Sequence, residues 1–380
     1  MVSAPTEFIL DLALLSVAAF AGGMITKKAG YPAALGEMVI GIAIGPFALG
    51  FVRFSEFLEL FAELGAIILL FYIGLETELD VFTRHIKPSS VVAIAGAVLP
   101  FVLGYYGALA MGFEGGESLL MGTVLMATSL GITIRMLKDI DRLHTHEGTI
   151  ILGAGVIDDI IAVVSLTIIT SLLAGAFALF DVGLLGGKIA FFWIIALVIG
   201  MRIVAPLFDR FVKNAEVLIL LLLALAFGFA FISAQLGLSA IIGAFAAGMA
   251  ISKMKLARES SRSLDSIFAF FVPIFFVSVG MQVDLRSFAI AIVPGLALTA
   301  LAVLGKVAGC GLAAKFMGSS NNESLRIGVG MIPRGEMGLI VATIGLASGF
   351  LRDEAFSASI VVVVLTTVIA LPALRKLFHE

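Results

Sequence analysis

Apolar stretches of about 20 residues recur along the whole chain, and each is long enough to cross a hydrocarbon core of about 30 Å as a helix. Hydrophobic residues make up 61% of the 380 residues and charged residues only 13%. This balance lies far from that of soluble domains. Because no stretch is left over for a soluble domain, the sequence predicts an all-α polytopic membrane protein.

The apolar stretches predict about 13 transmembrane helices. We expect them at 6–26, 32–51, 58–75, 88–110, 117–137, 146–173, 182–205, 215–234, 238–252, 264–281, 288–314, 323–349 and 355–377. The first stretch carries Glu7 and Asp11 where a signal peptide would have basic residues, so we expect it to be retained as the first helix.

Basic residues are unevenly distributed among the predicted loops. Seventeen lysines and arginines fall after odd-numbered helices or at the C-terminus, and four fall on the other side. Basic residues concentrate in the cytoplasmic loops of membrane proteins. We therefore expect a multi-pass protein of the cell (inner, cytoplasmic) membrane, with its N-terminus outside and its C-terminus in the cytoplasm.

The two halves of the chain resemble each other at an offset of 206 residues, which aligns Gly74 with Gly280 and Glu78 with Asp284. The offset spans an odd number of predicted helices, so the halves would cross the membrane in opposite senses. This pattern is typical of secondary transporters with inverted repeats. Chance similarity between two Gly-rich apolar sequences is the alternative.

Helix-breaking residues interrupt the fifth and twelfth predicted helices at matching positions. Residues 127–133 read Ala-Thr-Ser-Leu-Gly-Ile-Thr, residues 332–338 read Ile-Pro-Arg-Gly-Glu-Met-Gly, and Thr128 lies 206 residues before Arg334. Pro, Gly and hydroxyl residues at mid-membrane allow a helix to break and free its backbone groups for an ion. The match favours two broken helices over two unrelated kinks.

Two adjacent carboxylates, Asp158 and Asp159, lie about a third of the way along the sixth predicted helix. An ionised carboxylate there costs roughly 2.5–3.5 kcal/mol on insertion scales, which makes the pair a candidate ion site. Neighbours on a helix point about 100° apart, so one can face a cation and the other a counter-charge. A helix that begins at the pair is the alternative, but the apolar residues of 149–157 argue against it.

Lys306 lies in the middle of the eleventh predicted helix, too deep for its ammonium group to reach water easily, and therefore needs a buried acidic partner. Five carboxylates have comparable placement: Asp158, Asp159, Glu37, Glu63 and Glu336. Arg334 and Glu336 lie two residues apart in the interrupted twelfth helix. They can compensate the exposed helix ends or pair with Glu37 or Glu63, and we expect both to be structural charges.

Other chemistry is disfavoured. Cys310 is the only cysteine, which excludes a disulfide or a cysteine metal site within one chain. An intramembrane aspartyl protease needs two aspartates that face one water, whereas adjacent residues of a helix diverge. A channel needs a continuous polar pore, and the deep charges are few and clustered. We expect no enzyme activity, no cofactor and no nucleic-acid partner.

The motifs together resemble the second family of monovalent cation/proton antiporters, most closely its NapA-like Na⁺/H⁺ members, over nearly the whole chain. They are Leu-Gly-Glu-Met-Val-Ile-Gly near residue 38, Glu-Leu-Gly-Ala near 65, Ala-Thr-Ser-Leu-Gly-Ile-Thr, Ile-Asp-Asp, Leu-Gly-Lys-Val and Pro-Arg-Gly-Glu-Met-Gly-Leu-Ile-Val-Ala. Kef-like relatives usually have Gln-Asp in place of Asp-Asp and carry a cytoplasmic nucleotide-binding domain, whereas this sequence ends at Glu380. These differences favour Na⁺/H⁺ exchange over the alternative, K⁺/H⁺ antiport or Kef-type K⁺ efflux.

The resemblance implies a lipid-embedded homodimer. Its dimerisation domain would comprise 6–75 and 215–281, its core ion-translocation domain 88–173 and 288–377, and 182–205 would form a linker helix. The two broken helices would cross beside the aspartates.

The resemblance also divides the site residues into roles. Thr128 and Ser129 would lie at the crossing, Asp159 would bind the metal cation (Na⁺, with Li⁺ or K⁺ as alternatives) or the proton, and Asp158 would pair with Lys306. We therefore expect a secondary active Na⁺/H⁺ antiporter with alternating access, in which proton and cation compete for a buried aspartate. If Lys306 also releases a proton, exchange is electrogenic, with two protons per Na⁺.

Overall fold

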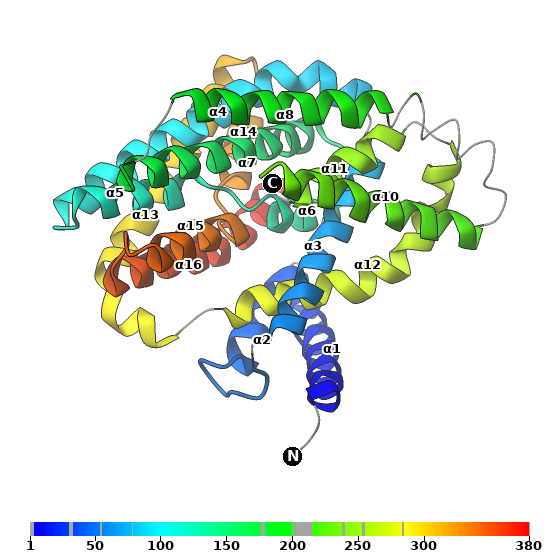
Figure 1. Ribbon diagram of the computed structural model, residues 1–380, viewed down its shortest axis with the longest axis horizontal. Helices are drawn as coiled ribbons and strands as arrows, with labels where there is room; N and C mark the ends of the chain where they lie inside the picture. The colour runs from blue at the N-terminus through cyan, green and yellow to red at the C-terminus, as the bar shows by residue number, and fades with distance from the viewer. Residues whose placement is uncertain are drawn as a thin grey trace. The chain divides into compact units, whose positions relative to one another are not determined.

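The computed structural model describes residues 4–29, 33–53, 55–77, 79–175, 179–199, 202, 215–237, 240–252, 255–282 and 285–379. The elements formed by these residues are helices (Figure 1). They are α1 (Ala4–Lys28), α2 (Ala33–Ile44), α3 (Glu56–Glu76), α4 (Leu79–Ala110), α5 (Gly115–Met126), α6 (Leu130–Asp139), α7 (His146–Leu173), α8 (Leu179–Ile199), α10 (Ala215–Gln235), α11 (Ala240–Ile251), α12 (Lys255–Met281), α13 (Leu285–Phe316), α14 (Asn321–Gly330), α15 (Glu336–Ala347) and α16 (Asp353–His379). The predicted all-α class is confirmed.

Among the described residues, nine helical stretches are long and apolar enough to cross a membrane. The second, seventh, ninth and twelfth predicted spans contain shorter apolar helices, at Ala33–Ile44, Gly186–Ala196, Ala240–Ile251 and Met337–Leu346. Residues 200–205 of the seventh span lie, apart from 202, outside the described residues.

Two of the described helices begin nine residues earlier than predicted, and one has the predicted bounds. α4 begins at Leu79 rather than 88, and α12 begins at Lys255 rather than 264. Both early turns are rich in charged residues, which hydropathy alone does not count as part of a span. The sixth predicted helix, 146–173, has the bounds of α7.

The chain divides into two compact units, which we describe separately. Unit 1 comprises Met1–Phe20, Val52–Arg84 and Leu179–Ser278, and unit 2 comprises Ala21–Phe51, His85–Ala178 and Val279–Glu380. This grouping differs from the predicted domains, because α2 lies in unit 2 and α8 in unit 1. α2 contacts α6, and α8 contacts α11. The predicted roles in dimerisation, linkage and ion translocation stay predictions.

The two halves of the chain repeat the same close helix contacts. In unit 1, a Cβ atom on Gly74 of α3 would collide with the carbonyl oxygen of Phe245 on α11. In unit 2, a Cβ atom on Gly280 of α12 would collide with the carbonyl oxygen of Met38 on α2. Gly74 and Gly280 are the residues aligned at the offset of 206, and Met38 and Phe245 are 207 apart.

A second pair of glycine contacts is repeated in the two halves at nearly the same offset. Gly36 of α2 packs against the carbonyl oxygen of Gly22 on α1, and Gly243 of α11 packs against that of Phe229 on α10. Both residues of the first contact lie 207 positions before their counterparts in the second. Glycine permits this approach of helix backbones within a membrane. The inverted repeat predicted from sequence is therefore present in the packing.

Gly248 offers a test of this close packing. A Cβ atom there would collide with the Phe71 carbonyl oxygen and lie 2.7 Å from the Leu75 nitrogen. We expect Gly248→Ala to lower the free energy of unfolding by about 1–3 kcal/mol, because two helices must separate. Thermal melting in detergent, followed by circular dichroism, measures the effect. Gly228→Ala on α10 is the control, because nothing lies within 4 Å of its Cβ position. Equal melting of both variants would contradict the packing.

Candidate ion-binding site

The two predicted interruptions meet inside unit 2. Residues 127–129 separate α5 from α6, and residues 331–335 separate α14 from α15. The backbone N–H of Ser129 donates to the carbonyl of Pro333 at 2.8 Å. Gly335 allows this approach, because a Cβ atom there would lie 2.8 Å from Ser129 Oγ. The predicted crossing of two broken helices is confirmed.

Hydroxyl groups satisfy carbonyls that the break in α14 frees. Thr133 Oγ1 donates to the Gly330 carbonyl at 2.8 Å, and Thr128 Oγ1 donates to that of Met331 at 3.4 Å. Thr128 and Ser129 are both buried. Carbonyls at helix C-termini carry partial negative charge, and N–H groups at N-termini carry partial positive charge. The crossing therefore gathers the ends of four half-helices in one buried place.

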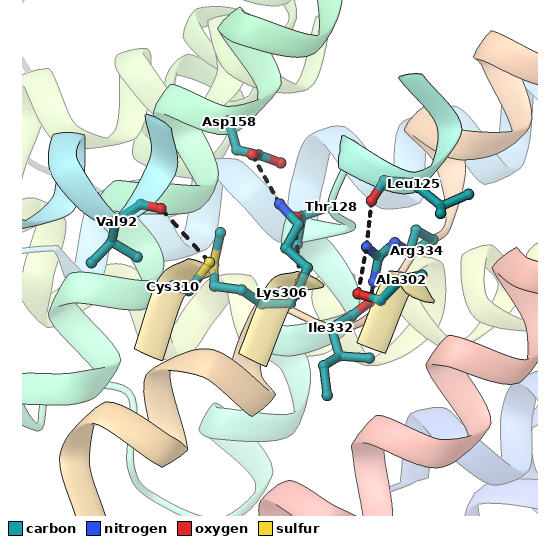
Figure 2. A network of polar contacts seen from close by, with 10 residues as sticks. Val92, Leu125, Thr128, Asp158, Ala302, Lys306, Cys310, Ile332 and Arg334 are labelled. Carbon is teal, nitrogen blue, oxygen red and sulfur yellow. Dashed lines mark hydrogen bonds and ion pairs between the residues drawn. The ribbon is translucent and has the colours of Figure 1, made fainter. Parts of the chain in front are cut away.

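Arg334 binds carbonyls at this crossing (Figure 2). Its guanidinium group is fully buried and donates to the carbonyls of Leu125, in the last turn of α5, and Ile332. A third bond, at 3.3 Å, reaches the Ala302 carbonyl on α13. The positive charge thus lies against carbonyls left unpaired by the helix breaks, where it offsets the negative ends of α5 and α14.

Asp158 and Lys306 form a buried ion pair between α7 and α13, with Nζ 3.0 Å from Oδ1 (Figure 2). The side chains are 1% and 0% exposed. Gly96 on α4 allows α13 to approach closely beside the pair, because a Cβ atom there would collide with Cys310 Sγ, one turn after Lys306. The second carboxylate oxygen of Asp158 is buried and has no hydrogen-bond partner among the described residues.

Asp159 is also buried, and helix geometry turns it about 100° from Asp158. Its helix, α7, contacts α5, α6, α14 and α15. Ala162, one turn after the aspartates, packs with Met126 and Ala127 at the end of α5 and with Met337 at the start of α15. The two aspartates therefore lie next to the crossing, within about a turn of it.

The other candidate partners of Lys306 lie elsewhere. Glu63 is exposed on α3 of unit 1, and Glu37 is 3.9 Å from Arg135 in unit 2. Glu336 begins α15, but its side chain lies outside the description, so its predicted structural role stays a prediction.

The sequence analysis missed two further ionic contacts in unit 2. Arg135, on α6, lies between Glu37 and Asp139. Arg135 stands inside a predicted span and four residues before Asp139, and these two features could have predicted a buried ionic contact. Glu117, near the start of α5, accepts hydrogen bonds from Arg352 Nε at 2.9 Å and Nη2 at 2.6 Å. These bonds raise the pKa of Arg352 above its usual range.

The chain is similar to known ion exchangers in sequence and in fold. The profile of transmembrane sodium/hydrogen exchangers matches residues 15–377. The Na⁺/H⁺-K⁺ antiporter GerN of Bacillus cereus is 38% identical, over 98% of this chain and 96% of its own. The Na⁺/H⁺ antiporter of Enterococcus hirae is 35% identical, over 98% of each. In fold, the chain is similar to the sodium proton antiporter MjNhaP1 from Methanocaldococcus jannaschii, with a TM-score of 0.75, 16% identity and 96% coverage of both chains.

The Asp158–Lys306 pair makes a stability prediction. Lys306→Gln leaves a buried, unpaired carboxylate, which we expect to cost about 3–5 kcal/mol of unfolding free energy. Lys306→Gln combined with Asp158→Asn removes both charges and should recover most of that loss. Thermal melting of the purified single and double variants measures it. A double variant no more stable than Lys306→Gln alone would contradict the account of the pair.

Proposed function

The chain belongs to the sodium/hydrogen exchanger family, and we propose that it exchanges Na⁺ for H⁺ through a single site at Asp158 and Asp159. The observation that carries this proposal is the ion pair of Asp158 and Lys306, beside a second buried aspartate and the crossing of two broken helices. Buried charges in membrane helices are costly and are retained where ions pass.

The ligands at the crossing suit a hard monovalent cation, because Na⁺ prefers oxygen ligands as other hard cations do. We assign the cation and the exchanged proton to the Asp159 carboxylate. The hydroxyls of Thr128 and Ser129, together with carbonyls of the two interruptions, can supply further oxygens. Arg334 offsets the negative ends of α5 and α14, which is the structural role we assign to it.

Competition for one carboxylate explains the coupling. A proton and a Na⁺ each neutralise Asp159, but they cannot do so together. A charged carboxylate is costly to carry through an apolar barrier, so the site changes its access only when one of the two ions is bound. Transport in one direction therefore requires transport of the other ion in return.

Lys306 supplies a second proton in this scheme. When Na⁺ binds, Asp158 can turn its carboxylate toward the cation, since Oδ2 already lacks a hydrogen-bond partner. The Lys306 ammonium would then lose its counter-charge in a buried place, which favours release of its proton. Two protons would be exchanged for each Na⁺, and the exchange would be electrogenic.

K⁺ is the second candidate cation, because a relative at 38% identity is named a Na⁺/H⁺-K⁺ antiporter. We further propose a place in the cell membrane with the N-terminus outside, as the distribution of basic residues predicts. Exposed apolar side chains such as Val17 and Phe20 on α1 suit contact with lipid or with a second copy of the chain.

Asp159→Asn tests the site assignment. The amide cannot exchange a proton for a cation, so we expect Na⁺-dependent proton flux to disappear at every pH. Proteoliposomes with an internal pH-sensitive dye measure that flux, in parallel with K⁺ and Li⁺. Glu63→Gln, an exposed glutamate on α3, is the matched control and should transport as the unmodified protein does. Full activity in Asp159→Asn would overturn the assignment.

The charge balance gives a separate prediction. If two protons cross for each Na⁺, a pH gradient drives Na⁺ flux faster when a membrane-permeant anion such as thiocyanate compensates the moving charge. The measurement compares Na⁺ uptake by proteoliposomes with and without this compensation, at the same pH gradient. Flux that is indifferent to membrane potential would remove the electrogenic claim and leave the exchange itself in place.

A further inference from the structure

Glu37 is a buried carboxylate that the exchange cycle does not use. It lies in α2 of unit 2, and its side chain is 4% exposed. Its Oε1 is 3.9 Å from Arg135 Nη2, beyond hydrogen-bond distance. Its Oε2 is buried and has no hydrogen-bond partner within the part of the chain that the structure describes. An ionised carboxylate in this position is poorly compensated, whereas a protonated one is far less costly to bury.

Arg135 is shared between Glu37 and Asp139, and the two carboxylates are not equivalent. Asp139 Oδ1 lies 3.3 Å from Arg135 Nε, and its Oδ2 accepts from the Ala33 N–H at the start of α2 at 3.2 Å. The Asp139 side chain is also more exposed, at 17%. Asp139 is thus contacted by both a cation and a backbone N–H, whereas Arg135 lies beyond hydrogen-bond distance of Glu37.

Few other charges of the described residues act on Glu37. In that part of the chain, the charged groups around it are Arg135 and Asp139 on α6 and Lys27 at the end of α1. Lys27 is exposed to solvent, where its field is screened. Lys138 on α6 neighbours Asp139 and has interactions of its own. The charge of Glu37 is therefore opposed mainly by Arg135.

We propose that Glu37 is a second proton-binding carboxyl group, and that its charge controls how firmly α6 is held against α2. When Glu37 is ionised, it attracts Arg135 and holds α6 at two points, with the Asp139–Ala33 bond as the other. When a proton from water neutralises Glu37, Arg135 keeps its contact with Asp139 but loses its attraction to α2, and the Asp139–Ala33 bond remains to hold α6 against α2.

The position of Arg135 on α6 links this proton to the ion site. Ser129, six residues before Arg135, lies about 9 Å along the helix and bonds to Pro333 at the crossing. α6 is short: Ser129 is its N-cap residue, and Arg135 and Asp139 lie in its second half. We therefore infer that an ionised Glu37 favours Na⁺ binding at the crossing, and that acid weakens binding through Glu37 as well as through direct competition. This inference rests on the proposed exchange function.

Glu37→Gln fixes the neutral state and provides the test. Infrared difference spectra of a pH titration should contain a protonated-carboxyl stretching band that the variant lacks; an unchanged set of bands would overturn the assignment of the proton. The infrared measurement requires no transport. Its outcome therefore tests the proton on Glu37 whether or not the proposed exchange function is correct.

The transport arm follows the apparent KM for Na⁺ in proteoliposomes against pH. We expect Glu37→Gln to raise KM about fivefold or more at alkaline pH and to leave it unchanged at acid pH, because the unmodified protein is then neutral at Glu37 as well. Glu63→Gln, at an exposed glutamate on α3 of unit 1, is the control and should leave KM unchanged at every pH. A pH-independent effect of Glu37→Gln would show a merely structural role and contradict the proposal.

Discussion

A backbone freed from a helix inside a bilayer must find partners within the protein, since hydrocarbon offers none. This constraint determines the centre of unit 2. The interruptions at 127–129 and 331–335 bond to each other through Ser129 and Pro333, and Arg334 takes up further carbonyls of their helix ends. Two broken helices can exist here because each supplies what the other lacks.

The same crossing explains why the aspartates of α7 can be charged so deep in the protein. Lys306 gives Asp158 a partner at 3.0 Å, and the half-helix ends bring hydroxyl, carbonyl and N–H groups to a place that lipid cannot reach. Close glycine contacts, repeated in both halves of the chain, bring the helices near enough for this. The close helix contacts at these glycines are therefore needed both for packing and for ion binding.

The features that local residues determine were predictable from the sequence. The bounds of α7 and the positions of both helix breaks follow from apolar length and from Pro, Gly and hydroxyl residues. Features that depend on tertiary contact were not predictable. Glu37 and Arg135 are 98 residues apart, and nothing in the residues around either one predicts that the two side chains meet. The placement of α2 in unit 2 likewise follows from its contacts with α6 and not from hydropathy.

The central claim is that Na⁺ and protons compete for the same buried carboxylates. Calorimetric titration of the purified protein with NaCl tests it directly, in buffers of different ionisation enthalpy, because the dependence of the heat on the buffer counts the protons released. The account predicts that Na⁺ binding releases protons, and that Asp159→Asn binds Na⁺ weakly or not at all. Na⁺ binding without proton release at any pH would contradict it.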